Sequence, residues 1–199
     1  LLQGEERLPE GGAQPSHRVT PGVSMKTPEE SRSRPVAPIV NSADDWRAEM
    51  LQLAQKKTPS FFHLTAPLPS SGRTNQVLGA TDMLSVVLKT YAEGGENELH
   101  AHPNEDHVFV VLQGGARFEG PAGEVHEARR YDCVLLPAGS FYKFQAFDDE
   151  ALVLLRIGAA VSPGANVLQR VGMDGRPFDG YSAENNEIPP TFMAGRYFA

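Results

Sequence analysis

Short runs of alternating apolar and polar residues dominate the middle of the chain. Turn residues such as Gly114 and Gly115, or Gly120 and Pro121, separate these runs. Alternation with a period of two between turn signals is typical of β-strands. The predicted strands cover residues 61–66, 76–80, 84–91, 108–112, 116–119, 124–128, 133–136, 141–147 and 151–157. Many short strands at regular spacing favour a sandwich or a closed barrel.

One stretch before these strands has helical periodicity instead. Ser42 can cap its start, and Pro59 ends it. Its apolar stripe consists of Trp46, Met50, Leu53 and Ala54. An amphipathic helix buries such a stripe against a neighbouring element. We therefore expect this helix to pack against the outside of a barrel.

Composition divides the chain into three parts. Residues 1–38 are rich in Pro, Gly, Glu, Arg and Ser and contain few large apolar side chains. Such a segment cannot bury enough surface to offset the entropy of ordering, so we expect a disordered leader or an arm that docks on a partner subunit. Residues 39–160 hold the helix and the strands. Residues 161–199 carry aromatic side chains that need burial, which predicts an ordered tail packed on the barrel or on a partner subunit.

Charge and composition limit the partners. The 199 residues carry a formal net charge of −7, which argues against nucleic acid because no basic face is available to neutralise phosphates. No apolar run approaches the roughly 18 residues of a membrane span. Cys133 is the single cysteine, which excludes an intrachain disulfide and favours the cytoplasm, and we expect it to be a small core residue. The first residue is Leu1 rather than methionine, which leaves open a processed or secreted form.

Three of the six histidines lie close together, at His100, His102 and His107. His100 and His102 are two residues apart and share one face of an extended strand. Pro103 and Asn104 are turn residues, so a hairpin could bring His107 back beside the first two. Neutral imidazole is the commonest side-chain metal ligand, and three imidazoles leave open positions for substrate. The spacing therefore predicts a site for one divalent metal ion.

Three carboxylates near these histidines have alternative roles. Glu105 and Asp106 could complete the metal site in place of His107, although solvated turn residues are the simpler expectation. Glu98 shares a strand face with His100. Its carboxylate could accept a hydrogen bond from an imidazole N–H, or it could lie on the rim of a pocket.

Residues 94–114 resemble the first motif of the cupin superfamily, Gly-x5-His-x-His-x(3,4)-Glu-x6-Gly. Gly94, His100, His102 and Gly114 match this motif in type and spacing. His107 stands at the glutamate position. This difference from the motif leaves open which residues bind the metal, but it does not affect the resemblance to the cupin fold.

A second cupin motif, Gly-x5-Pro-x-Gly-x2-His-x3-Asn, is matched in part downstream. Pro137 and Gly139 match, whereas Tyr131, Tyr142 and Ala146 stand at its first glycine, its histidine and its asparagine. The resemblance covers roughly residues 60 to 160. It implies an all-β fold, the cupin-type double-stranded β-helix (a jelly-roll barrel), with one N-terminal helix and an ordered C-terminal tail.

Tyr142 replaces the last metal ligand of the motif and is our candidate catalytic residue. Its phenol could bind substrate, stabilise an oxyanion or act as an acid or base; it could also ligate the metal as a phenolate or simply fill space. Arg156 could bind a substrate carboxylate if it points inward, but a surface ion pair is the simpler expectation. Strand alternation also suggests a set of pocket residues, for which core packing is the alternative role: Tyr91, Phe109, Gln113 and Phe144, with Glu98 at the rim.

The resemblance and the three histidines together imply a metal-dependent cupin enzyme. The leading hypothesis is a non-haem iron dioxygenase of a small aromatic or diketone-like substrate, with Fe(II) favoured over Zn, Ni, Mn or Cu. A non-redox lyase or isomerase with Tyr142 as base is one alternative, and a non-catalytic small-molecule-binding protein is another. The expected partners are a small-molecule substrate, O2 as a candidate co-substrate and a second copy of the chain in a homodimer.

Overall fold

The computed structural model describes residues 36–182, 185 and 188–199. Most of the predicted leader, residues 1–35, lies outside the described residues. Within the described part, no helix combines the length and the apolar character needed to cross a membrane.

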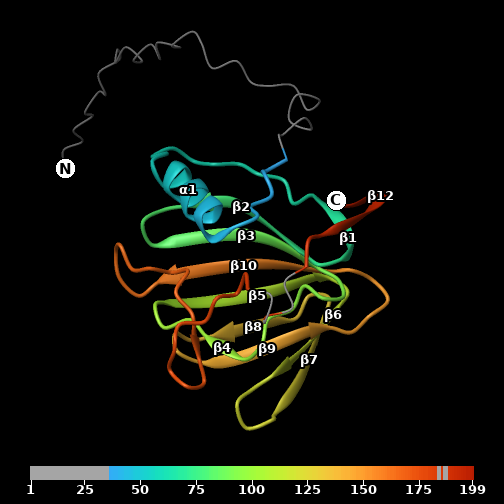
Figure 1. Cartoon of the computed structure of the whole chain (residues 1–199). Coiled ribbons are helices and arrows are strands. Elements are labelled where there is room, and N and C mark those ends of the chain that lie inside the picture. Colours follow the sequence, from blue (N-terminus) through green and yellow to red (C-terminus); the bar gives the residue numbers. More distant parts are fainter. Residues whose placement is uncertain (1–35, 183–184, 186–187) are drawn as a thin grey trace, which may run out of the picture. The chain divides into compact units, whose positions relative to one another are not determined.

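The single described α-helix, α1 (Ala43–Ala54), forms where the apolar stripe predicts it. The Ser42 hydroxyl accepts a hydrogen bond from the Asp45 amide at 3.0 Å, which satisfies one of the free N–H groups of the first turn. Trp46 is buried and packs with Val40, Val77 and Val87. The helix lies beside strand β2, as Figure 1 shows, but Trp46 contacts the face of β3 that also carries Tyr91, so the helix does not pack on the outside of the barrel as expected.

Twelve strands make up the rest of the described chain. They are β1 (Ala66–Ser71), β2 (Arg73–Ala80), β3 (Leu84–Tyr91), β4 (His100–Ala101), β5 (Glu105–Gln113), β6 (Gly115–Glu119), β7 (Val125–Arg129), β8 (Cys133–Leu136), β9 (Phe141–Ala146), β10 (Leu152–Ala160), β11 (Val171–Gly172) and β12 (Thr191–Phe198). One five-stranded sheet has the order β2-β3-β10-β5-β8, and a second has the order β11-β4-β9-β6-β7. β1 and β12 form a separate two-stranded ribbon.

The two five-stranded sheets face each other as the halves of a jelly-roll barrel (Figure 1). Phe109 and Leu154 of the first sheet share one buried cluster with Phe118, Tyr142 and Phe144 of the second. Burial of these inward-facing side chains drives the two sheets together. The predicted all-β jelly-roll architecture with one N-terminal helix is confirmed.

The first strand lies later in the chain than the sequence predicts. Residues 61–65 form no strand, and residues 70–74, which the pattern assigns to a loop, belong largely to β1 and β2. The prediction took Pro67 as the end of a strand, because proline cannot donate to a sheet ladder. Pro67 and Pro69 are tolerated here because β1 pairs only with β12 and has one free edge.

The position of Cys133 also differs from the prediction. Cys133 is exposed rather than buried in the core. Side chains alternate along β8, and Leu136 faces the interior while Leu135, like Cys133, faces solvent. An apolar run of four residues does not reveal which of its two faces is buried.

The last part of the chain returns to the barrel at two places. β11 pairs with β4, with Gly172 opposite His100. β12 pairs with β1, and Met193 and Phe198 pack against the cluster formed by Leu68, Leu88 and their neighbours. Residues 161–182 thus lie next to the strand that carries His100.

Candidate metal centre

Two short strands carry the histidines. His100 lies on β4 and is paired with Tyr142 of β9, while His107 lies on β5 and is paired with Leu136 of β8 and Gly158 of β10. The turn between β4 and β5 folds the chain back, so that residues from both sheets meet at one end of the barrel. β4 and β5 lie in different sheets and do not pair, so the hairpin predicted from Pro103 and Asn104 does not form, but the turn between the two strands still places His107 beside His102.

The Pro137–Gly139 turn forms hydrogen bonds with the chain around the turn between β4 and β5. The Gly139 amide donates to the His102 carbonyl at 2.9 Å, and the Ala138 amide donates to the Asp106 carboxylate at 2.6 Å. Gly139 has a φ of 81°, a left-handed conformation that glycine adopts without strain. Asp106 is exposed, as expected, and caps this turn.

The three imidazoles are buried and adjacent. The ring centroids of His100 and His102 are 5.2 Å apart, and those of His102 and His107 are 4.9 Å apart. The Tyr142 ring lies 5.0 Å from His100 and 5.6 Å from His107. The structure thus brings together all three predicted ligand residues and the predicted catalytic tyrosine.

Hydrogen bonds orient two of these rings. His100 Nδ1 lies 2.7 Å from the backbone carbonyl of Glu98, which can only accept, so Nδ1 carries the proton and Nε2 keeps its lone pair. Glu98 thus acts through its backbone, and its side chain is exposed. His102 Nδ1 is buried without a hydrogen-bond partner among the described residues.

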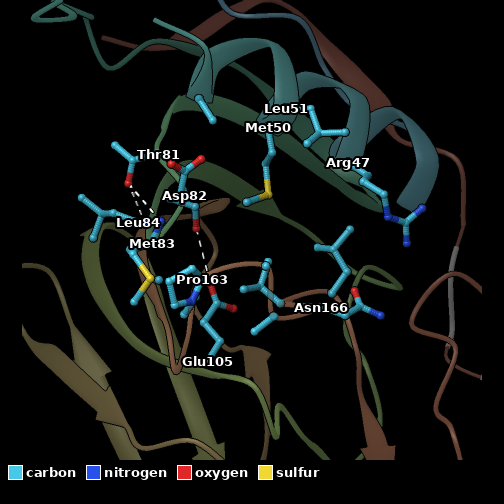
Figure 2. A pocket seen from close by; sticks show the side chains of 18 residues that line it. Arg47, Met50, Leu51, Thr81, Asp82, Met83, Leu84, Glu105, Pro163 and Asn166 are labelled. Carbon is cyan, nitrogen blue, oxygen red and sulfur yellow. Dashed lines mark hydrogen bonds between the residues drawn. The ribbon is translucent and has the colours of Figure 1, made fainter. Parts of the chain in front are cut away.

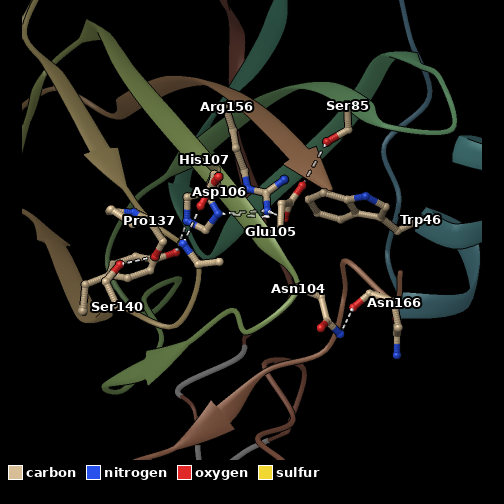
Figure 3. A network of polar contacts seen from close by, with 12 residues as sticks. Trp46, Ser85, Asn104, Glu105, Asp106, His107, Pro137, Ser140, Arg156 and Asn166 are labelled. Carbon is tan, nitrogen blue, oxygen red and sulfur yellow. Dashed lines mark hydrogen bonds and ion pairs between the residues drawn. The ribbon is translucent and has the colours of Figure 1, made fainter. Parts of the chain in front are cut away.

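His107 belongs to a buried polar network, drawn in Figure 3. Its Nε2 lies 3.0 Å from the Tyr142 hydroxyl, and its Nδ1 lies 3.4 Å from Arg156 Nη2 and 3.8 Å from a Glu105 carboxylate oxygen. A guanidinium only donates, so this arrangement makes Nδ1 an acceptor and puts the proton on Nε2. Coordination through Nε2 requires that proton to move to Nδ1, where the Glu105 carboxylate faces it, as in other carboxylate–histidine–metal arrangements.

Glu105 and Arg156 form a buried ion pair. Glu105 is 1% exposed and Arg156 is 4% exposed, so both simpler expectations, a solvated turn residue and a surface arginine, are wrong. Ser85 donates a further hydrogen bond to Glu105 at 3.4 Å. The pair forms because β5 and β10 are neighbours, and each charge offsets the cost of burying the other.

Burial keeps all three imidazoles neutral. Desolvation, and then the nearby cations, lower the pKa of His100 to about 3 and that of His107 to about 2. The same causes lower the pKa of His102 well below its usual value. Arg170 and Arg156 are the leading cations beside His102. A neutral imidazole is the form that binds metal.

The donor set fits a divalent metal ion. His102, Glu105 and His107 each offer a ligand atom, and these atoms lie within 4.8 Å of one another. This buried His-Glu-His cluster could hold a metal, and the adjacent His100 offers a free Nε2. His100 does not belong to this cluster of ligand atoms, and Arg156 engages the Glu105 carboxylate.

Comparison with known proteins agrees with this geometry. A family profile described as "Cupin domain" matches residues 87–158, the segment that includes all three histidines and Tyr142. The chain contains a cupin domain. No curated protein sequence matches the chain.

Solved cupin structures show a limited similarity. The cupin domain of Schizosaccharomyces pombe Cnp3 is 17% identical, with a TM-score of 0.42, over 44% of this chain and 64% of that domain. KdgF from a Halomonas species is 21% identical, with a TM-score of 0.41, over 49% of this chain and 88% of the other. An RmlC-like cupin from Shewanella frigidimarina is 20% identical, with a TM-score of 0.44, over 57% of this chain and 96% of the other.

Tyr142 gives this cupin site its unusual character. It is 5% exposed, and burial raises the pKa of its phenol to about 12. The side chain therefore stays a protonated phenol at neutral pH. Its hydroxyl points at His107, from the position where the cupin motif carries its last histidine.

The interior of the cupin barrel is nearly filled beside the histidines. The remaining space measures about 20 Å³, room for one or two water molecules. Tyr91, Phe109 and Phe144 lie on its wall, whereas Gln113 and Glu98 do not. Gln113 instead donates a hydrogen bond to the Ala151 carbonyl. The other wall residues are Trp46, Lys89, Asn97, His100, His102, Tyr142, Arg156, Leu168 and Arg170.

Sequence reasoning missed Lys89, Arg170 and Trp46 on this wall and favoured a surface position for Arg156. Lys89 Nζ lies 5.1 Å from the Trp46 ring centre, and Arg156 Cζ lies 5.9 Å from it. Lys89 had a detectable signal, because it occupies the same strand face as Val87 and Tyr91 in an otherwise apolar run. Arg170 had none, because it comes from the irregular segment after the barrel.

A larger cavity of about 440 Å³ borders the same network on the side of α1 (Figure 2). Its mostly apolar wall consists of Met50 and Leu51 of the helix, Met83 and Leu84 where β3 begins, and residues 163–168. Glu105 lies at one end of it. Cavities of this size commonly take small molecules.

Proposed function

We propose that the protein is a non-haem iron dioxygenase that binds Fe(II) through His100, His102 and His107 and acts on a small organic substrate. The observation that supports it best is the convergence of three buried, neutral imidazoles at one end of the barrel. Three neutral nitrogen ligands leave coordination positions open for both substrate and O2. When bound, Fe(II) supplies the one-electron chemistry that O2 requires.

The surrounding residues would position the substrate and control its protons. The Tyr142 phenol, protonated at neutral pH, can donate a hydrogen bond to a substrate oxygen. The aromatic wall formed by Tyr91, Phe109 and Phe144 excludes water and lowers the local dielectric. The apolar cavity beside Glu105 offers room for an aromatic or diketone-like substrate.

A non-redox lyase or isomerase has weaker support. That mechanism needs Tyr142 as a base. Burial raises the pKa of its phenol to about 12, so the phenolate is scarce at neutral pH.

The test combines metal analysis with O2 consumption. We expect the purified full-length protein, loaded anaerobically with Fe(II), to bind one iron and to consume O2 only with a suitable aromatic or diketone substrate. His100→Ala and His102→Ala should each remove most of the iron, because two nitrogen ligands hold a weak site. His126→Ala is the matched control, since His126 is exposed on β7 and should leave the iron content unchanged.

Two results would contradict the proposal. Full iron content in His100→Ala or His102→Ala would place the metal elsewhere. A tightly held Zn, Ni, Mn or Cu, combined with turnover that consumes no O2, would favour the non-redox alternative.

A further inference from the structure

The wall beside the histidines is strongly cationic. Lys89, Arg156 and Arg170 belong to it, and no carboxylate does among the residues described. Arg156 is neutralised from behind by Glu105. A divalent metal at the histidines would add two more positive charges to a space from which water is almost excluded. Charges in such a space need a partner of opposite sign.

Arg170 is the cation that is left over. Its Nε is buried and has no hydrogen-bond partner, and no ion pair in the described part of the chain joins Arg170 to an acidic side chain. Burial is the main cause that lowers the pKa of its guanidinium, followed by the neighbouring Arg73. A buried guanidinium nitrogen without a partner is costly, which points to a ligand that accepts its hydrogen bond.

The backbone around Arg170 directs it at the histidines. Arg170 directly precedes β11, whose Val171 lies opposite Ala101 of β4, between His100 and His102. The Arg170 carbonyl accepts from the Phe178 amide at 3.0 Å, and the Phe178 ring stacks on His100 with the ring centres 4.9 Å apart. The segment that carries Arg170 therefore closes the wall over the imidazoles.

Gly180 leaves room for the guanidinium. A Cβ at this position would lie 2.7 Å from Arg170 Nη1 and 2.9 Å from its Cζ. The Gly180 carbonyl also accepts a hydrogen bond from Arg73. The chain thus packs the Arg170 guanidinium against the Gly180 backbone, on the wall of the space beside the histidines.

We propose that the substrate of this site carries a carboxylate, and that Arg170 binds it next to the histidines. This inference rests on the proposed function, whose substrate it narrows to organic acids. A carboxylate matches the planar fork of arginine and supplies the missing negative charge.

Binding of simple acids to the Fe(II)-loaded protein under nitrogen tests the proposal. We expect formate and acetate to bind in calorimetric or NMR titrations, and formamide and acetamide to bind far more weakly. Arg170→Gln should weaken acetate binding roughly ten- to a hundredfold, the range expected for a hydrogen bond to a charged group. Arg176→Gln is the matched control. It removes the same charge from an exposed side chain nearby and should leave the affinity unchanged.

Arg170→Lys keeps the charge but loses the fork, and it serves if Arg170→Gln does not fold. We expect weaker acetate binding in Arg170→Lys than in the wild type. Wild-type affinity in either folded variant, or equal binding of acetate and acetamide, would overturn the proposal. So would inorganic phosphate that bound at Arg170 more tightly than the acids.

Iron content separates the two proposals. A wild-type protein that retains no iron contradicts the dioxygenase proposal, whatever acids it binds. A protein that retains iron and consumes O2, but shows no dependence of acid binding on Arg170, contradicts only the inference about the carboxylate.

Discussion

At the scale of single residues, the unusual feature is a phenol where cupins commonly carry a last metal ligand. Tyr142 is buried against His100 and His107, and its hydroxyl contacts His107 Nε2 at 3.0 Å. Burial raises the pKa of the phenol to about 12, so Tyr142 is a protonated phenol in the metal-free protein. Under the proposed function it would act as a proton donor beside the metal ligands.

Replacing Tyr142 by phenylalanine tests this role. We expect Tyr142→Phe to keep the fold and the iron, since it removes one hydroxyl, and to slow turnover roughly 10²- to 10⁴-fold through loss of a donor or acid. Steady-state O2 consumption and iron content provide the measurement.

Optical spectra of the oxidised iron form serve as the control for Tyr142→Phe. A phenolate ligand would give a charge-transfer band in the wild type that is lost in the variant. A variant with full activity and an unchanged spectrum would show that Tyr142 only fills space.

At the scale of elements, the site depends on a turn that contributes no ligand. The Pro137–Gly139 turn binds the His102 carbonyl through the Gly139 amide and binds Asp106 through the Ala138 amide. These two contacts connect the turn between β8 and β9 to the segment that carries His102 and His107. The turn should therefore affect metal binding without touching the metal.

A pair of glycines separates this effect from simple destabilisation. Gly139 and Gly123 both have a φ of 81°, and neither has an atom within 4 Å of an added Cβ. Gly139→Ala and Gly123→Ala should each lower the free energy of unfolding by roughly 1–2 kcal/mol, the cost of a left-handed alanine. Only Gly139→Ala should also lower the affinity for iron, because of the two glycines only Gly139 contacts the segment that carries the histidines.

Urea unfolding and metal titration of both glycine variants provide the measurements. Equal iron affinity in the two variants would show that the turn does not position the ligands.

At the scale of the whole molecule, the barrel interior is a buried, positively charged space. Arg156 and Arg170 both lower the pKa of His102 and His107. Protonation of any imidazole would add charge to this interior, so folding favours the neutral rings.

The metal-free protein should consequently lose stability in mild acid. The pKa of a histidine in the unfolded chain is about 6.5, whereas burial lowers the pKa of His100 to about 3 and that of His107 to about 2 in the folded protein. Between these values the unfolded chain binds more protons, so stability rises with pH up to about 6.5 and falls as the pH drops below it. The slope should approach roughly 1.4 kcal/mol per pH unit for each buried histidine.

Urea unfolding of the metal-free protein between pH 4 and pH 8, in steps of about one pH unit, measures this slope. His102→Gln should reduce the slope by about one proton, and His126→Gln, at an exposed site, should not change it. A flat profile would show that the imidazoles are solvated in the absence of metal.

Local patterns were enough to predict the elements and most of the site. Alternation and turn residues depend on a few neighbours, so they located most strands, the Ser42 cap and the turn that brings the histidines together. A spacing of two residues places His100 and His102 on one face of any extended strand. The match to the cupin motifs then indicated how the strands close into a barrel.

Only the tertiary structure decided which polar residues are buried. Glu105 is buried because Arg156, 51 residues later, lies on the neighbouring strand. Cys133 is exposed because the fold buries the opposite face of β8. Arg170 reaches the histidines because β11 returns to β4. Such burial depends on contacts between segments that are distant in sequence. The sequence alone does not show whether a charged side chain is solvated or paired with a buried partner.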